Sequence, residues 1–120
     1  MANYIQTCYH DYDRIFITKK YGEPHEFLLF YLAWDPEKYR TDPNLVRYFK
    51  TDWHWVDSFD KFVFVNDWEI KKILQYSNTP MSQKLKMLLI TSPENYPAGW
   101  SKIKTIDFLD GSSAFEILKR

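Results

Sequence analysis

Three short apolar runs constrain the fold of this chain more than any other feature. They occupy residues 14–18, 61–65 and 86–90, and each contains three or four consecutive apolar side chains. Because apolar and polar residues do not alternate in them, strands formed by these runs would be apolar on both faces. Such strands need cover on each side of a sheet. We therefore predict that the three runs form its buried centre.

Helical patterns separate these runs. Residues 25–34 follow Pro24, and proline suits a first helical turn because its missing N–H needs no partner there. Residues 68–76 follow the capping pair Asn66-Asp67 and also show helical spacing. In the first helix, four aromatic residues recur at spacings of three and four and predict its inward face: Phe27, Phe30, Tyr31 and Trp34. Leu28 and Leu32 widen that predicted face.

The remaining segments give weaker signals. A short helix is expected over residues 4–10, with Ile5 and Cys8 facing inward. A second short helix, opened by Asp42 as a cap, is expected over residues 42–49. Near the end, Asp110-Gly111 separates two strand-like runs, which predicts a hairpin.

This order of elements predicts a fold class. Strands that alternate with helices favour a parallel sheet with crossover connections. We predict one layered α/β domain over residues 1–120, with a mainly parallel sheet of about five strands, helices on both faces and a C-terminal β-hairpin. With only three glycines, the chain has no glycine-rich loop of the kind that cradles a nucleotide phosphate.

Charge and cysteine content exclude several functions. The 120 residues carry 16 basic and 16 acidic side chains, so the chain lacks the positive charge expected of a nucleic-acid partner. No apolar run reaches the roughly 18 residues that a membrane span requires. Cys8 is the only cysteine, which excludes an internal disulfide and a cysteine-based zinc site.

Two histidine–aspartate pairs have a spacing that suits metal ligands. His10 precedes Asp13 by three residues, and His54 precedes Asp57 by the same interval. A metal site needs three or four converging ligands, and each pair supplies two. We therefore predict no metal and no cofactor.

Other candidate catalytic groups also have ordinary explanations. Asp57, Asp60 and Asp67 bracket the second apolar run, where paired carboxylates can perform acid–base chemistry, but such residues commonly cap helices and turns. Cys8 has no evident base beside it in the sequence to form a reactive thiolate. We predict no catalytic residue in this chain.

Aromatic residues are in excess, at 19% of the chain. Most must lie in the core, but four fall outside the predicted apolar strands and helices: Trp53, Trp55, Tyr96 and Trp100. An exposed aromatic patch commonly marks a binding surface. We predict that these four form the binding site and that at least two of their rings are exposed. The alternative is that they fold back as lids over the ends of the sheet.

Several segments resemble a known family. Residues 22–31 read GEPHEFLLFY, follow an apolar run, and lead into DPEKY at residues 35–39. This block is similar to one in the C-terminal soluble region of bacterial and archaeal membrane glycosyltransferases, the group that resembles dolichyl-phosphate-mannose protein mannosyltransferases and aminoarabinose transferases. Residues 59–64 and 106–117 also resemble the end of such proteins, so the resemblance loosely covers most of the chain.

The resemblance implies a role without catalysis. In that family the reaction on a polyprenyl-phosphate sugar belongs to a multi-helix membrane module, which this chain does not contain. The chain is then expected to be an extracytoplasmic part of a larger protein, with the membrane module and a glycan or polypeptide acceptor as its partners. Two alternatives remain: a free-standing α/β interaction domain in the cytoplasm, and a small intracellular enzyme with an unrecognised site.

Overall fold

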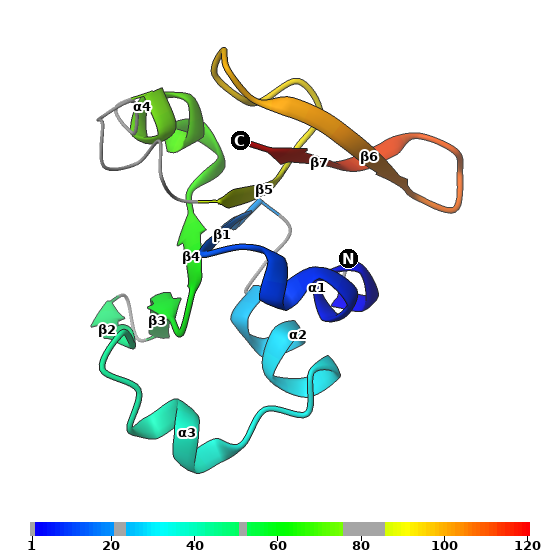
Figure 1. Cartoon of the computed structure of the whole chain (residues 1–120). Coiled ribbons are helices and arrows are strands. Elements are labelled where there is room, and N and C mark those ends of the chain that lie inside the picture. The colour runs from blue at the N-terminus through cyan, green and yellow to red at the C-terminus, as the bar shows by residue number, and fades with distance from the viewer. Residues whose placement is uncertain (1, 21–23, 51–52, 76–85) are drawn as a thin grey trace.

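The computed structural model describes residues 2–20, 24–50, 53–75 and 86–120, and these fold around one seven-stranded sheet (Figure 1). Short 3₁₀ helices are labelled η. The elements in chain order are α1 (Ala2–Cys8), η1 (Tyr9–Asp11), β1 (Arg14–Thr18), α2 (Pro24–Tyr31), α3 (Pro36–Arg40), β2 (Val46–Lys50), β3 (Trp53–Phe59), β4 (Phe62–Val65), η2 (Asp67–Glu69), α4 (Ile70–Gln75), β5 (Met87–Thr91), β6 (Ser101–Asp107) and β7 (Ser113–Lys119).

The three apolar runs form the centre of the sheet, as predicted. The strand order is β2-β3-β4-β1-β5-β7-β6, so β1 lies between β4 and β5. Both of these pairings are parallel, with Ile15 opposite Phe62 on one side and Leu88 on the other. Every residue of β5 is buried.

The sheet is larger and more mixed than predicted. It has seven strands rather than about five, and the pairings of β2 with β3, β3 with β4, β5 with β7 and β6 with β7 are all antiparallel. The difference arises because β2 and β3 form a hairpin that continues through a tight turn at Asp60-Lys61 into β4. Only the three central strands are parallel.

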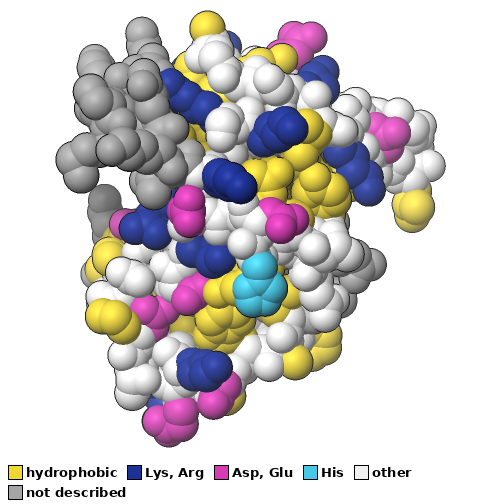
Figure 2. Space-filling view, in the orientation of Figure 1, with side chains coloured by type: hydrophobic (Ala, Val, Ile, Leu, Met, Phe, Trp, Pro, Cys, Tyr) yellow, Lys and Arg dark blue, Asp and Glu magenta, His cyan; other side chains and the backbone are white. Residues whose placement is uncertain are grey.

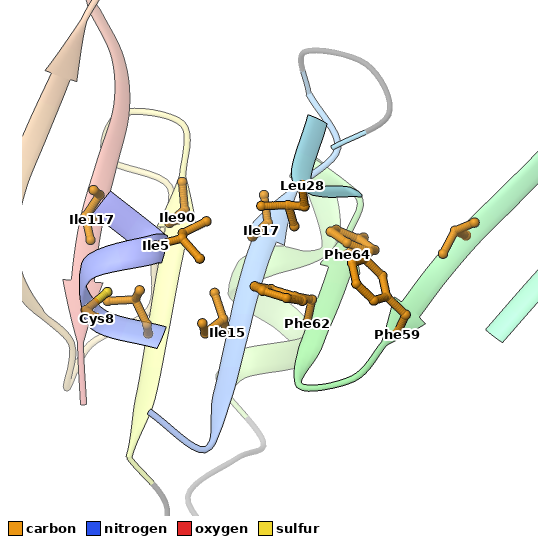
Figure 3. Close-up of a cluster of buried hydrophobic side chains, with 12 residues drawn as sticks. Ile5, Cys8, Ile15, Ile17, Leu28, Phe59, Phe62, Phe64, Ile90 and Ile117 are labelled. Atoms are coloured by element: carbon orange, nitrogen blue, oxygen red, sulfur yellow. The ribbon is translucent and has the colours of Figure 1, made fainter. Parts of the chain in front are cut away.

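One face of the sheet is covered by α1 and α2. Ile5 and Cys8 of α1 are buried as predicted, and they point toward β1, β5 and β7 (Figure 3). Beside them, Leu28 of α2 lies over three phenylalanines (Figure 3). This larger cluster contains Ile5, Cys8, Ile15, Ile17, Leu28, Val56, Phe59, Phe62, Phe64, Leu88, Ile90 and Ile117.

The opposite face of the sheet is covered by α4 and by the segment before β6. Ile70 and Leu74 of α4 are buried against Val65, Met87 and Leu89 of the sheet. Alternation along the strands supplies both clusters, since neighbouring residues of β5 enter different ones. Strands without a polar face thus receive the cover that they require.

The predicted inward face of α2 is confirmed at Leu28, Leu32 and Trp34, and it is wrong at Phe30. The side chains of Phe27 and Tyr31 lie outside the described residues. Phe30 is 78% exposed, whereas Leu28 is fully buried and Leu29 and Leu32 pack against the same cluster. Together with buried His25, these residues also follow a spacing of three and four. The helix ends at Tyr31, and Ala33, two residues further on, has a positive φ of 48° that departs from helical geometry.

The helix expected over residues 42–49 is wrong. The carboxylate of Asp42 accepts a hydrogen bond from the Asn44 amide at 2.8 Å, so Asp42 closes a turn rather than capping a helix. The chain then enters β2 and pairs with β3. The missed helix α3 lies earlier and is capped by Asp35, whose carboxylate accepts from the Glu37 amide.

A polar cluster joins the N-terminal helices to the turn between β3 and β4. The ammonium of Lys61 donates to the carbonyls of Tyr9 and Tyr12, each at 2.9 Å, and lies 3.9 Å from the centre of the Tyr9 ring. The Tyr9 hydroxyl donates to the carboxylate of Asp60. Asp60 has a positive φ of 50°, and its amide donates to Asp42.

The predicted C-terminal hairpin is confirmed. β6 and β7 pair across the turn that contains Asp110-Gly111, and Gly111 adopts a φ of +89° that favours glycine. The turn extends away from the rest of the molecule (Figure 1). Acidic and basic side chains are interspersed on the face of the molecule in view, in keeping with zero net charge (Figure 2).

Truncation of the central strands tests their placement. Phe64→Ala or Leu88→Ala should each lower the free energy of unfolding by about 2–5 kcal/mol, because each leaves a cavity in the larger cluster. Urea denaturation measures the change. Val46→Ala in edge strand β2, where Val46 is half exposed, is a control expected to cost much less. Small effects at both Phe64 and Leu88 would contradict a buried centre.

Four partly buried tyrosines have a raised pKa, and we therefore predict that the protein loses stability at alkaline pH. Desolvation, followed by the hydrogen bond to Asp60 and its charge, raises the pKa of Tyr9. Desolvation also raises the pKa of Tyr4, Tyr12 and Tyr39. Their contribution to stability is complete below the unfolded tyrosine pKa of about 10 and is lost as the pH rises toward the folded values.

Tyr9→Phe separates this contribution from general alkaline unfolding. The variant should lose about 1–3 kcal/mol at pH 7, because the Asp60 carboxylate loses its donor. It should then lose less than the parent chain between pH 9 and 11, measured by urea denaturation. Tyr48→Phe on β2 is the matched control. An identical pH profile for Tyr9→Phe and the parent would refute the assignment.

Candidate functional site

The carboxyl ends of β1 and β4 form a topological switch point. The connection that leaves β1 begins with α2, which covers one face of the sheet, whereas the connection that leaves β4 begins with η2 and α4, which cover the other. β1 and β4 are parallel neighbours, so their connections separate between them. In open α/β sheets, ligands bind in the crevice outside the carboxyl ends of strands at such a point.

A crevice of about 290 Å³ opens at this edge. We call it the carboxyl-edge crevice, and it is lined by Lys19, Tyr48, Asp57, Ser58, Val63, Phe64, Val65, Asn66 and Glu69. These residues come from β2, β3 and β4 and from the segments that directly follow β1 and β4. Strands far apart in the sequence therefore contribute to one surface.

An ion pair lies at the centre of this crevice. The Lys19 ammonium is 2.5 Å from a carboxylate oxygen of Asp57, and the Tyr48 hydroxyl donates to the same oxygen at 3.4 Å. The Lys19 side chain is 12% exposed and that of Asp57 is 43% exposed. The lysine side chain is thus largely shielded from solvent, while the carboxylate remains open to a ligand.

A β-bulge places Asp57. Val46 of β2 pairs with Ser58 of β3, and the next residue, Arg47, pairs with Val56, so Asp57 is an extra residue with no partner on β2. Bulges of this kind redirect a side chain and are common beside functional sites. The Ser58 hydroxyl donates to the Asn44 carbonyl at 2.7 Å, which ties the bulged strand to the loop before β2.

The segment after β4 is fixed by hydrogen bonds to its neighbours. Thr18, at the end of β1, donates its hydroxyl to the Asp67 carboxylate at 2.7 Å. The Asn95 side chain donates to the Asp67 carbonyl at 2.6 Å. Within the crevice, the Asn66 side-chain amide donates to the Glu69 carboxylate at 3.2 Å. These bonds fix the segment that contains Asn66 and Glu69, and they leave some of the donors and acceptors of these two side chains available to a ligand.

This arrangement suits binding better than catalysis. The carboxylates of Asp57, Asp67 and Glu69 already accept hydrogen bonds, and the Ser58 hydroxyl already donates to a backbone carbonyl. Carboxylate, amide and phenol groups together present both donors and acceptors around a small concave surface. A ligand that carries several hydroxyl groups has the same mixture of donors and acceptors.

The predicted aromatic site does not form one exposed patch around Trp100. Trp100 is only 7% exposed and packs in the cluster under α4, while Tyr96 is half-buried against the same cluster. The backbones of Trp53 and Trp55 belong to β3, but their side chains lie outside the described residues. Whether two of the four rings are exposed stays a prediction.

A second polar cluster lies near Tyr96. The Lys102 ammonium is 3.2 Å from the Glu116 carboxylate, which is buried in β7. The hydrogen bond to Glu116 and then its charge raise the pKa of Lys102, and Tyr96 and Glu94 add smaller effects in the same direction. The second oxygen of Glu116 has no hydrogen-bond partner among the described residues.

The residues that define the crevice have no distinctive local pattern in the sequence. Asp57 stands out only as a metal-ligand or acid–base candidate, and no motif marks Lys19 or Tyr48. Trp68 was placed in a helix, yet it is 81% exposed in η2, between crevice residues Asn66 and Glu69. Position after the end of a predicted central strand is the signal that identifies Lys19 and Asn66.

The other candidate groups are not brought together. Among the described residues, no three His, Cys, Asp or Glu side chains are grouped so as to hold a metal. Burial, and then the charge of Asp11, raise the pKa of the Cys8 thiol, which favours its unreactive form. The Asp60 carboxylate lies at the β3–β4 turn and accepts a hydrogen bond from the Tyr9 hydroxyl.

Comparison with protein families, with characterised proteins and with solved structures finds no match for this chain. Among its described helices, none is long and apolar enough to cross a membrane.

Two tryptophan substitutions distinguish core from surface. Trp100→Ala should cost about 3–5 kcal/mol of unfolding free energy, because the ring fills the cluster under α4. Trp68→Ala should change stability by less than about 0.5 kcal/mol, because its ring is exposed. Thermal and urea denaturation of the two variants provide the comparison. Equal destabilisation would contradict the exposure of Trp68.

Proposed function

We propose that this chain is a non-catalytic, saccharide-binding, extracytoplasmic domain of a membrane glycosyltransferase. The geometry that supports binding is the Lys19–Asp57 pair, presented by a β-bulge in a crevice at the topological switch point. The link to a glycosyltransferase rests on the resemblance of residues 22–31 and 35–39 to that family.

The chemistry of the crevice favours a neutral, hydroxylated ligand. Lys19 offsets the charge of Asp57, so the Glu69 carboxylate is the one uncompensated charge among the lining side chains, and it disfavours an anionic ligand. Asp57, Asn66 and Tyr48 supply acceptors and donors to hydroxyl groups, and exposed Trp68 lies in the adjoining turn. The indole ring of a tryptophan has an apolar face and a polar N–H at its edge, and this combination suits contact with a sugar. The occupant is then the glycan or a sugar-bearing acceptor.

A saccharide titration followed by NMR tests the binding role. A panel of neutral mono- and disaccharides at millimolar concentration should shift the amides of Lys19, Asp57 and Asn66. Asp57→Asn should weaken binding by about five- to ten-fold, because the ligand loses a charge-assisted hydrogen bond and Lys19 loses its partner. Asp107→Asn, on distant strand β6, is the matched control and should bind as the parent does.

Two results would contradict the proposal. Saccharides that leave the crevice amides unmoved, or that bind Asp57→Asn as tightly as the parent, would remove the crevice as the site. The glycosyltransferase assignment has its own test: the gene should encode a multi-helix membrane module in the same polypeptide as this domain. A gene without that module would exclude the glycosyltransferase and favour a free-standing interaction domain.

A further inference from the structure

A cavity at the opposite, amino-terminal edge of the parallel strands is lined mainly by basic and hydroxyl-bearing side chains. It has a volume of about 500 Å³ and is lined by Asp11, Tyr12, Lys86, Gly99, Ser101, Lys119 and Arg120. We call it the basic cavity. It shares no lining residue with the carboxyl-edge crevice, so it forms a separate surface.

The backbone positions of its two lysines are fixed by the sheet. Lys86 directly precedes β5, and its amide donates to the Asp13 carboxylate at 2.9 Å while its carbonyl accepts from the Asp13 amide at 2.7 Å. Lys119 ends β7 and lies opposite Leu88 on one side and Ser101 on the other. Directly paired residues point to the same face of a sheet, so Lys119 and Ser101 project together.

The charges around the cavity are unequal. Among the lining side chains, Lys86 and Lys119 outnumber Asp11, and Arg120 adds a further basic group. The Asp13 carboxylate, which accepts from the Lys86 amide, lies beside this lining. The chain as a whole has no net charge, so this concentration is local. Ser101 and Tyr12 add hydroxyl groups, which donate hydrogen bonds to anionic oxygens.

We propose that the basic cavity binds a phosphate monoester. A phosphate monoester carries about −1.5 to −2 charges at neutral pH, so the excess of basic over acidic side chains in the lining attracts it, and its oxygens accept several hydrogen bonds at once. The cavity lies within the size range of small-ligand sites, so the group esterified to the phosphate also fits. A soluble phosphate ester and a lipid with a phosphate headgroup present this same chemistry.

Glycerol phosphate is the soluble probe, and glycerol is its uncharged control. Titration of the full chain with glycerol phosphate should shift the amides of Lys86, Ser101 and Lys119, and glycerol should leave them unmoved. Lys86→Gln and Lys119→Gln should each weaken the affinity by about two- to five-fold, the range of a partly exposed ion pair. Asp11→Asn should strengthen it, because the one acidic side chain of the lining is removed.

Lys72→Gln, which changes an exposed side chain of α4, is the matched control and should bind glycerol phosphate as the parent does. A thermal melt of each variant establishes that the fold is intact. Unchanged affinity in both Lys86→Gln and Lys119→Gln, or shifts confined to residues outside the cavity, would overturn the proposal.

Vesicles distinguish the two sources of the phosphate. Sedimentation with phosphatidylcholine vesicles that contain phosphatidic acid, but not with phosphatidylcholine alone, would assign the cavity to a lipid headgroup if Lys86→Gln and Lys119→Gln reduce it. Binding of glycerol phosphate without vesicle binding would assign it to a soluble ester. Absence of binding to both probes in the parent chain would refute the site.

Discussion

The need to cover β1, β4 and β5 on both faces determines most of this structure. Each strand sends side chains into two separate clusters, so an uncovered face would expose a continuous apolar surface. Helices α1 and α2 cover one face, and α4 with the Trp100 segment covers the other. The chain must therefore leave β1 and β4 toward opposite faces. That separation produces the switch point at which the carboxyl-edge crevice lies.

The polar groups of the crevice occupy places that the covering elements leave open. Lys19 and Asn66 directly follow central strands, where the backbone turns away from the sheet. Asp57 enters the same space because the β2–β3 pairing contains one extra residue. The Lys61 ammonium acts elsewhere: it donates to the carbonyls of Tyr9 and Tyr12, and so it fixes η1 against the β3–β4 turn. Stability and the candidate site thus rest on different parts of the chain.

The central strands and the last hairpin were predictable because their signals are local. Unbroken apolar runs and an Asp-Gly turn specify them without reference to distant residues. The face of α2 was predictable only in part, because its broad apolar pattern includes both Leu28 and Phe30, and only packing against the sheet decides that Leu28 is buried and Phe30 is exposed.

The candidate site depends on longer-range effects. Asp42 has the sequence of a helix cap but closes a turn, since the following residues gain more by pairing with β3. The position of Asp57 depends on a register shift that no local pattern encodes. Trp100 has polar neighbours in the sequence, yet the folded chain buries it under α4. Lys19 was identifiable only from its place after a predicted strand.

The position of β1 in both the sequence and the sheet has a consequence for synthesis. β1 is made before both of its neighbours in the sheet, because Ile15 pairs with Phe62 and Arg14 pairs with Met87, which lie far along the sequence. Until β5 has left the ribosome, an apolar strand keeps at least one open edge. Sheets built from such distant pairings fold slowly, and exposed strand edges promote aggregation in the interval. Protection of this nascent strand, by α1 and α2 or by a chaperone, is then a requirement for producing the protein.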